Sequence, residues 1–579
     1  MRLHVRWLGR VPYREALAVQ RALFEHGRGN HLLLLEHPHV FTHGPRADLA
    51  TNVLVAPASV GAELVAVNRG GDVTYHGPGQ LVGYPILTLP SKFGPSSGLS
   101  DTVDYVRSVE QLVIDVLAEL GLPGAGRLAD HPGVWADPTG PSPRKICAIG
   151  VRLSRGRTMH GFALNVTTDM AYLRDCIVPC GIADRPVTSL AEEGVTVTMQ
   201  HVVDVVSRLA AARWGDGQLD RADVAWRHAP DDLTPFSRGE GPGEVVRPST
   251  AAGEARVLPT HGAAPHAGTA VRLSRRLEQA GVTDGLDIST RKPDWLRPKV
   301  HHGPEVLALK RTVRDLGLVT VCEEAGCPNL SECWSDGTAT FMVLGERCTR
   351  ACGFCLVDTR KPLAPDADEP VKVADAVARM GLAHAVITMV ARDDLADGGA
   401  AGVAATIDAI HARVPGTAVE ALISDLKGSL ADLDVVLAAR PEVLNHNLET
   451  VARLQRAVRP SAGYARSLAV LAHAKLAGAT TKSGLIVGMG ETDDEIDGAL
   501  TDLGSIGVDI VTIGQYLRPT THHLPVHRWV EPDRFEHYRR VGEAAGIAHV
   551  EASPLTRSSY HARSAASAVG VAVKDGSFT

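Results

Sequence analysis

The sequence predicts a two-domain α/β protein, and three observations support this class. The chain has 579 residues, whereas a domain averages roughly 150 residues and an α/β barrel uses roughly 250. Strand-like and helix-like runs alternate through both halves, and a stretch of different composition separates them. We therefore expect a first domain over residues 1–227, a linker over 228–269 and a second domain over 270–579.

The first domain mixes strands with helices and is expected to be α+β. Apolar residues recur at helical spacing over 105–121, and Gly121 followed by Pro123 is a typical helix end. Short apolar runs bounded by polar residues predict strands at 31–36, 81–89, 145–153 and 161–166.

The linker is recognised by its composition. Residues 228–269 are rich in Pro, Gly, Ser, Ala and His, as in PFSRGEGPGEVVRPSTAAGEA, and show no periodicity. Such a stretch cannot bury enough apolar area to offset the entropy of ordering it. It is typical of a flexible tether.

The second domain repeats short β-rich runs with helical stretches between them. This order predicts parallel strands joined by right-handed crossovers, in a closed or partly closed barrel. In such barrels the chemistry lies at the carboxyl ends of the strands, and a cysteine-rich loop follows the first run. The six expected strands are 339–345, 385–390, 418–423, 443–448, 482–488 and 510–516.

Charge and hydropathy exclude several classes of protein. The 59 Lys and Arg residues against 66 Asp and Glu residues give a net charge of −7, which argues against nucleic-acid binding. No apolar run approaches the roughly 18 residues that cross a bilayer, and the N-terminus does not resemble a signal peptide. We expect a cytoplasmic protein with no membrane contact, in which the nine cysteines are not disulfides.

Six cysteines lie between residues 322 and 355, in two triplets spaced C-x4-C-x5-C and C-x3-C-x2-C. Structural zinc is the alternative, but zinc favours paired C-x2-C knuckles with a fourth ligand nearby, and each triplet is one ligand short. Three thiolates on a tight loop suit a cubane cluster with one iron left open. An open iron can hold S-adenosylmethionine, which yields a carbon radical when one electron is supplied.

Several segments of the second domain resemble lipoyl synthases, which are radical S-adenosylmethionine (radical-SAM) enzymes. They are GERCTRACGFC, CEEAGCPNLSEC, RKPDWLRPKV, RDDLADGGA, NHNLET, TKSGLIVGMGET, GQYLRPT and RSSYHA. The resemblance implies a partial (β/α)6 barrel of the TIM type, S-adenosylmethionine as cosubstrate, an electron donor and two [4Fe-4S] clusters. It also implies that sulfur is inserted at carbons 6 and 8 of an octanoyl chain.

The same resemblance implies the cluster ligands. The reducing cluster would be bound by Cys348, Cys352 and Cys355. The auxiliary cluster, the implied sulfur source, would be bound by Cys322, Cys327, Cys333 and a serine of RSSY, with Ser559 favoured over Ser558.

A thiol and a lysine are the candidate catalytic groups of the first domain. Cys180 lies between Pro179 and Gly181, on a constrained turn where backbone N–H groups could converge on a substrate oxygen. A free thiol is mostly protonated at neutral pH, and a neighbouring ammonium favours the thiolate. Lys145 is the candidate ammonium, and a surface lysine without a role is the alternative. Cys147 and Cys176 are interpreted as buried and inert.

The segments RGGDVTYHGPGQ, RKICAIG, HGFALN and PCGI resemble lipoyl(octanoyl) transferases. The resemblance implies a fold like that of biotin/lipoate protein ligases, with Cys180 as the acyl-thioester nucleophile and Lys145 as the residue that tunes it. It implies two partners, octanoyl-acyl carrier protein and the lipoyl domains of 2-oxoacid dehydrogenase complexes and of the glycine cleavage H protein. The implied acyl-binding wall is Arg69, Gly70, Gly71, Asp72, Val73, Thr74, Tyr75, His76, Ala148, Ile149, Gly150, Gly161, Phe162 and Ala163.

Together the halves predict a bifunctional enzyme of lipoate biosynthesis, which octanoylates lipoyl domains and then inserts sulfur. Two alternatives stay open. One is an ATP-dependent lipoate- or biotin-type ligase fused to another radical-SAM sulfur inserter. The other is a non-catalytic iron–sulfur redox sensor, against which the acidic charge and the lack of a basic DNA-reading segment weigh.

Overall fold

The chain divides into two compact units, Met1–Trp226 (unit 1) and Arg227–Thr579 (unit 2). The computed structural model describes residues 2–91, 101–129, 131–182, 185–226, 276–297, 329–335 and 337–573. The expected linker 228–269 and two expected cluster ligands, Cys322 and Cys327, lie outside these residues. Among the described helices, none combines the length and the apolar character needed to cross a membrane.

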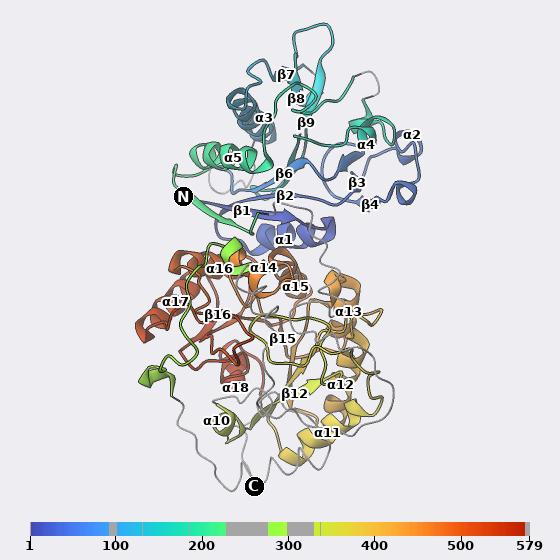
Figure 1. Cartoon of the computed structure of the whole chain (residues 1–579). Coiled ribbons are helices and arrows are strands. Elements are labelled where there is room, and N and C mark those ends of the chain that lie inside the picture. Colours follow the sequence, from blue (N-terminus) through green and yellow to red (C-terminus); the bar gives the residue numbers. More distant parts are fainter. Residues whose placement is uncertain are drawn as a thin grey trace, which may run out of the picture. The chain divides into compact units, whose positions relative to one another are not determined.

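Unit 1 is built on a mixed eight-stranded sheet in the order β11-β1-β2-β6-β10-β9-β8-β7 (Figure 1). Strand β1 pairs in parallel with β2 and β11, and the remaining pairs are antiparallel. Its strands are β1 (Leu3–Arg10), β2 (Asn30–Glu36), β6 (Gln80–Ile86), β7 (Gly126–Leu128), β8 (His131–Ala136), β9 (Arg144–Ser154), β10 (Arg157–Asn165) and β11 (Leu219–Asp223). A second, three-stranded sheet is formed by β3 (Val40–His43), β4 (Glu63–Ala66) and β5 (Thr74–His76).

Helices cover both faces of the large sheet of unit 1. Helices α3 (Thr102–Glu119) and α5 (Met199–Trp214) share one aliphatic core with β1, β2, β6 and β10, whereas α1 (Tyr13–His26) packs with β3 and β4 in another. Figure 1 shows α1 on the opposite side of the sheet from α3 and α5. Asp101 begins α3 by accepting hydrogen bonds from two backbone N–H groups, as an N-cap residue does. The α+β class expected for this domain is confirmed.

Unit 2 contains a seven-stranded parallel sheet in which the strands follow the chain order (Figure 1). The strands are β12 (Thr338–Val343), β13 (His384–Met389), β14 (Ala418–Leu422), β15 (Val443–Asn445), β16 (Thr481–Val487), β17 (Ile510–Gln515) and β18 (His549–Ala552). The intervening helices include α11 (Glu369–Met380), α12 (Ala400–Arg413), α13 (Leu430–Ala438), α15 (Tyr464–Leu476), α16 (Asp493–Ser505) and α17 (Pro532–Ala544). In the described chain β18 does not pair with β12, so the sheet is open at that point.

A buried ion pair crosses the inside of this sheet. The ammonium of Lys482 on β16 donates to the Glu420 carboxylate on β14 at 2.9 Å, and the Asn445 amide donates to its other oxygen at 2.7 Å. Each of these three side chains is at most 1% exposed. Burial raises the pKa of Glu420, but Lys482, His384 and Asn445 outweigh it and lower the pKa to about 2.

Replacing Glu420 by glutamine is expected to destabilise unit 2 by about 3 kcal/mol, because it leaves a buried ammonium without a carboxylate. The lowered pKa means that the carboxylate stabilises the fold above its unfolded-state value and that this contribution is lost as the pH falls toward 2. Urea unfolding at a series of pH values measures both effects. The double variant Glu420→Gln/Lys482→Met is the control and should recover most of the loss. An equal loss in the double variant would show that the unpaired ammonium is not the cause.

Candidate functional site

The thiol of Cys180 lies on a strained turn of unit 1. The 3₁₀ turn η2 (Pro179–Gly181) places Cys180 at φ +57° and ψ 20°. This left-handed conformation is uncommon for a residue with a side chain, and such strain gathers at functional positions. The turn is held by a 2.8 Å hydrogen bond from the Cys180 N–H to the Val73 carbonyl of the glycine-rich loop.

Lys145, the second residue of β9, is buried with 6% of its surface exposed. Its backbone N–H donates to the Pro186 carbonyl at 2.9 Å, and its carbonyl accepts from the Thr188 N–H at 2.9 Å. The segment after the Cys180 turn is thus fastened to β9 at this lysine. The ammonium lies 5.0 Å from the centre of the Trp135 ring on β8.

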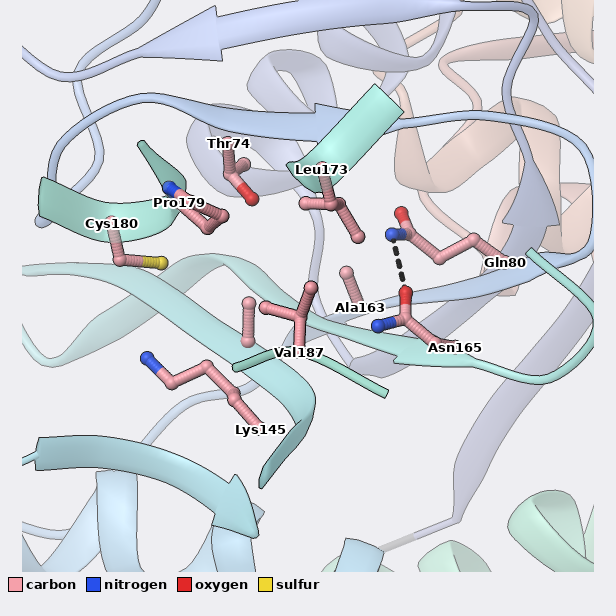
Figure 2. A pocket seen from close by; sticks show the side chains of 10 residues that line it. Thr74, Gln80, Lys145, Ala163, Asn165, Leu173, Pro179, Cys180 and Val187 are labelled. Carbon is pink, nitrogen blue, oxygen red and sulfur yellow. Dashed lines mark hydrogen bonds between the residues drawn. The ribbon is translucent and has the colours of Figure 1, made fainter. Parts of the chain in front are cut away.

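Cys180 and Lys145 line the same pocket, and Figure 2 shows them at one end of it. The middle of the pocket is apolar, and the amides of Gln80 and Asn165 lie at the other end, joined by a 2.9 Å hydrogen bond. The empty space in and in front of the pocket is about 280 Å³, part of which is open solvent. These walls suit an aliphatic chain whose reactive carbonyl lies at the thiol end. The lining residues are Thr74, Gln80, Lys145, Ala148, Ala163, Asn165, Leu173, Pro179, Cys180 and Val187.

Three residues of the expected acyl-binding wall, Thr74, Ala148 and Ala163, line this pocket. Arg69 does not line it and donates to the carbonyls of Gly70 and Asp72 and to Thr42, which fixes the shape of the loop. The other expected wall residues are also absent from the lining: Gly70, Gly71, Asp72, Val73, Tyr75, His76, Ile149, Gly150, Gly161 and Phe162.

Sequence reasoning missed part of the lining. Leu173 and Val187 lie outside the motifs, and no sequence signal places them at the pocket. Asn165 ends HGFALN and donates to the Thr188 carbonyl at 3.0 Å, so it orients the Gln80 amide. A polar residue at the end of a buried strand can predict a lining position, because a buried amide needs a hydrogen-bond partner.

The expected convergence of backbone N–H groups on a substrate oxygen is not present in this turn. The N–H of Cys180 donates to Val73, that of Gly181 to the Val178 carbonyl at 3.1 Å, and that of Ile182 to the Pro179 carbonyl at 3.1 Å. The 3₁₀ turn uses the Gly181 and Ile182 donors internally, and the glycine-rich loop accepts from the Cys180 donor. The Lys145 ammonium is therefore the charged donor that the pocket offers to a carbonyl oxygen.

The other two thiols of unit 1 differ from Cys180. Cys147 is fully buried in β9, and burial raises the pKa of its thiol. Cys176 is 8% exposed, and burial together with Asp175 and Asp169 raises the pKa of its thiol. Neither lines the pocket, so Cys180 is the thiol that a substrate can reach.

In unit 2 the second cysteine triplet occupies the loop after β12. The Cys348 N–H donates to the Asp358 carbonyl at 2.8 Å, and the Gly353 N–H donates to the Val458 carbonyl at 2.8 Å. Arg350 braces the loop with ion pairs of 2.7 Å to Asp393 after β13 and 2.6 Å to Asp425 after β14. The loop is therefore fixed at the carboxyl ends of the strands, where barrel enzymes place their chemistry.

The three thiols of this loop fit a soft metal centre. Burial raises the pKa of Cys348, Cys352 and Cys355, that of Cys352 to about 11, and neighbouring thiols raise it further at the last two. Bound iron would instead stabilise the thiolates. Within the described residues, no three His, Cys, Asp or Glu side chains are arranged to hold a single metal ion. In a cubane each thiolate binds a different iron, so a cluster does not require the three thiols to converge on one ion.

Buried polar atoms without partners surround the same loop. They include Oδ2 of Asp425, Oδ1 of Asn447 and both amide atoms of Gln455. Gln455 begins the short helix α14 (Gln455–Val458), and that helix contacts the cysteine loop through the Gly353–Val458 hydrogen bond. Such atoms suit the amino and carboxylate groups of a small polar cosubstrate.

The described part of the first triplet lies beside the RSSY segment. Asn329 donates to the Leu555 carbonyl at 2.8 Å, and the Tyr560 hydroxyl donates to Glu332 at 3.2 Å. Burial and Glu332 raise the pKa of Tyr560 to about 12, and Cys333 adds to this rise. Ser559, the residue before Tyr560, is thus in the neighbourhood of Cys333.

Two protein families match the chain. Residues 12–210 match the family described as the lipoyl protein ligase A/B catalytic domain, and residues 342–503 match the radical SAM superfamily. Over 273 residues the chain is 55% identical to a lipoyl synthase of Rubrobacter xylanophilus, which covers 47% of this chain and 85% of that protein. It is 52% identical over 288 residues to a lipoyl synthase of Mycobacterium tuberculosis, covering 50% of this chain and 93% of that protein.

Two solved structures show low similarity to the chain. A putative lipoate protein ligase from T. acidophilum with bound lipoic acid is 20% identical at a TM-score of 0.32, covering 39% of this chain and 91% of that protein. Methylornithine synthase is 13% identical at a TM-score of 0.30, covering 48% of this chain and 85% of that protein.

Proposed function

The chain belongs to the lipoyl synthase family through its second unit, and on this premise we propose that it carries out two consecutive steps of lipoate biosynthesis. Unit 1 transfers an octanoyl group from acyl carrier protein to a lysine of a lipoyl domain. Unit 2 then inserts sulfur at two carbons of that chain. The observation that supports the first step is the pairing of Cys180 with Lys145 at one end of an apolar pocket.

The acyl transfer needs two exchanges at Cys180. The thiolate attacks the thioester carbonyl of the carrier, a new C–S bond forms, and the carrier thiolate leaves and takes up a proton. The lysine amine of the lipoyl domain then attacks the acyl-Cys180 thioester, which yields an amide and restores the thiolate. Thioester exchange is nearly balanced in energy and amide formation is downhill, so no nucleotide is required.

Lys145 has two tasks in this scheme. Its ammonium favours the thiolate and donates to the oxygen that gains negative charge in each exchange. The amine that attacks in the second exchange must lose a proton, and Lys145 in its neutral form, or another nearby base, accepts it. The apolar lining excludes water that would hydrolyse the acyl-enzyme.

For unit 2 we propose that Cys348, Cys352 and Cys355 hold a [4Fe-4S] cluster. Together with S-adenosylmethionine this cluster supplies a radical that removes hydrogen from an alkyl chain. Asn447, Gln455 and Asp425 orient the cosubstrate through their unpartnered atoms, and the parallel sheet shields the reaction from water. A second cluster, the sulfur source, is proposed on Cys322, Cys327, Cys333 and Ser559.

We propose that residues 228–269 act as a tether that lets both units work on one lipoyl domain. The first unit would end near residue 227 and the second would begin near residue 270. Comparing the intact chain with an equimolar mixture of the severed units tests this role. Equal overall rates at low enzyme concentration would contradict it.

The complete proposal is tested by mass spectrometry of a lipoyl domain. The reduced protein is incubated anaerobically with octanoyl-acyl carrier protein, S-adenosylmethionine and an apo lipoyl domain, without any nucleotide triphosphate. We expect an octanoylated domain first and then a domain with two added sulfur atoms, with release of 5′-deoxyadenosine. A requirement for ATP would point to a ligase instead. Absence of 5′-deoxyadenosine would point to a redox sensor.

A further inference from the structure

The ammonium of Lys145 is held in an unusual way for a buried charge. Buried lysines are normally paired with a carboxylate, but in the described part of the chain no carboxylate forms an ion pair with Lys145. Glu110, in the same region, is occupied: its oxygens accept from the Gly133 N–H at 3.2 Å and from Arg127 at 2.8 Å. The contact that remains is the Trp135 ring, whose centre is 5.0 Å from the nitrogen.

Three features of β8 determine how it contacts this lysine. Trp135 is fully buried, and its indole N–H donates to the His131 carbonyl at 3.1 Å, which fixes the ring plane. The pairing of β8 with β9 is irregular between Val134 and Trp135. Gly133 has φ +120°, and a Cβ there would lie 2.6 Å from the Cys147 carbonyl oxygen and 3.3 Å from Cε of Lys145, so the glycine allows β9 and the lysine stem to approach closely.

We propose that Trp135 is a positioning residue that holds the Lys145 ammonium at the Cys180 end of the pocket. The proposal rests on the acyl transfer proposed above and identifies what makes Lys145 effective in it. A carboxylate partner would neutralise the ammonium and weaken its effect on the thiol. The negative face of an indole ring attracts the ammonium and leaves its charge in place. Lys145 can then stabilise the negative charge of the thiolate.

Other groups also face this pair and must be separated from the effect of Trp135. Arg69 is close enough to interact electrostatically with Cys180, and Cys147 with both Cys180 and Lys145. Asp72 lies against the next residue of the turn, since a Cβ on Gly181 would be 3.4 Å from its carboxylate. None of these groups changes when Trp135 is replaced, so a change in thiol reactivity reports on Lys145.

The test measures thiol reactivity and not turnover. The full-length protein is treated with iodoacetamide from about pH 6 to about pH 10. The peptide that contains Cys180 also contains Cys176, so fragment-ion mass spectrometry is used to assign the alkylation to Cys180. We expect Trp135→Leu to slow alkylation of Cys180 about tenfold at neutral pH and to leave the rate at high pH unchanged. Lys145→Met should have an effect at least as large.

Two further variants distinguish the electrostatic effect of the indole face from the effect of losing side-chain volume. Trp214 is also packed against the core of unit 1, and its indole N–H donates to Ser108 at 3.0 Å, so Trp214→Leu is the matched control and should keep the profile of the unchanged protein. Site-specific replacement of Trp135 by a fluorinated tryptophan keeps the shape and weakens the negative face. We expect its alkylation rate at neutral pH to lie between the rates of the unchanged protein and of Trp135→Leu. If Trp135→Leu does not fold, the fluorinated variant tests the proposal.

The outcomes are distinguishable. If the Trp135 variants keep the profile of the unchanged protein while Lys145→Met loses it, Trp135 does not position the lysine and the proposal is wrong. If Lys145→Met also keeps that profile, the coupling of Lys145 to Cys180 in the proposed function fails, and the role of Trp135 fails with it.

Discussion

Replacing Cys180 by serine is expected to lower octanoyl transfer by about a thousandfold or more. A serine hydroxyl ionises far less readily than a thiol, and a nearby ammonium cannot ionise it at neutral pH. Lys145 is the other ionisable side chain among the described lining residues, and the variant leaves it in place. The transfer rate to an apo lipoyl domain and the mass of the octanoylated protein measure the loss.

Cys176→Ser is the matched control for this substitution. Cys176 lies four positions earlier, is 8% exposed and does not line the pocket, so its loss should leave transfer nearly unchanged. Sulfur insertion into a lipoyl domain that is already octanoylated should be unaffected in Cys180→Ser. Continued transfer by Cys180→Ser would show that the thiol is not the nucleophile. Loss of both activities would show that the two units do not act independently.

Periodicity and turn chemistry predicted much of the fold. The six strands expected in the second domain are present as β12 to β17, because parallel strands buried on both faces form continuous apolar runs. The seventh strand, His549–Ala552, was missed because it is only four residues long and mostly half-buried. In unit 1 the short strands β3, β4 and β5 were missed for a related reason: their pairing depends on contacts distant in sequence.

The sequence identified some features of the candidate sites and missed others. Motif spacing singled out Cys180 and Lys145, and the structure brings both to one pocket although the rest of β9, β10 and α4 (Ala171–Arg174) separate them in sequence. Local sequence could not reveal that these N–H groups already have acceptors, two within the turn and one in the glycine-rich loop, since this depends on the turn type and on a contact distant in sequence. The contact between Trp135 and Lys145 also escaped prediction, because an irregular strand pairing creates it.

Replacing Cys352 by alanine is expected to abolish both 5′-deoxyadenosine formation and sulfur insertion, and to leave octanoyl transfer by unit 1 unchanged. Cys352 lies in the middle of the triplet. Its loss leaves only the thiolates of Cys348 and Cys355, and two thiolates do not hold a cubane as three do. The measurements are the iron content of anaerobically prepared protein, chromatography of 5′-deoxyadenosine and the octanoyl transfer rate. The control variant is Cys176→Ser, since Cys176 is a buried cysteine outside the triplets and outside the pocket lining.

The variant Cys333→Ala separates the two proposed clusters. Cys333 lies beside Tyr560 and is a proposed ligand of the auxiliary cluster and not of the reducing cluster, so its loss is expected to remove only the proposed sulfur source. We expect 5′-deoxyadenosine to form at a measurable rate while sulfur insertion stops, and the iron content to fall by about half. A protein that contains zinc and almost no iron would contradict both cluster assignments. Equal loss of 5′-deoxyadenosine in Cys333→Ala and Cys352→Ala would mean that the two triplets serve one centre.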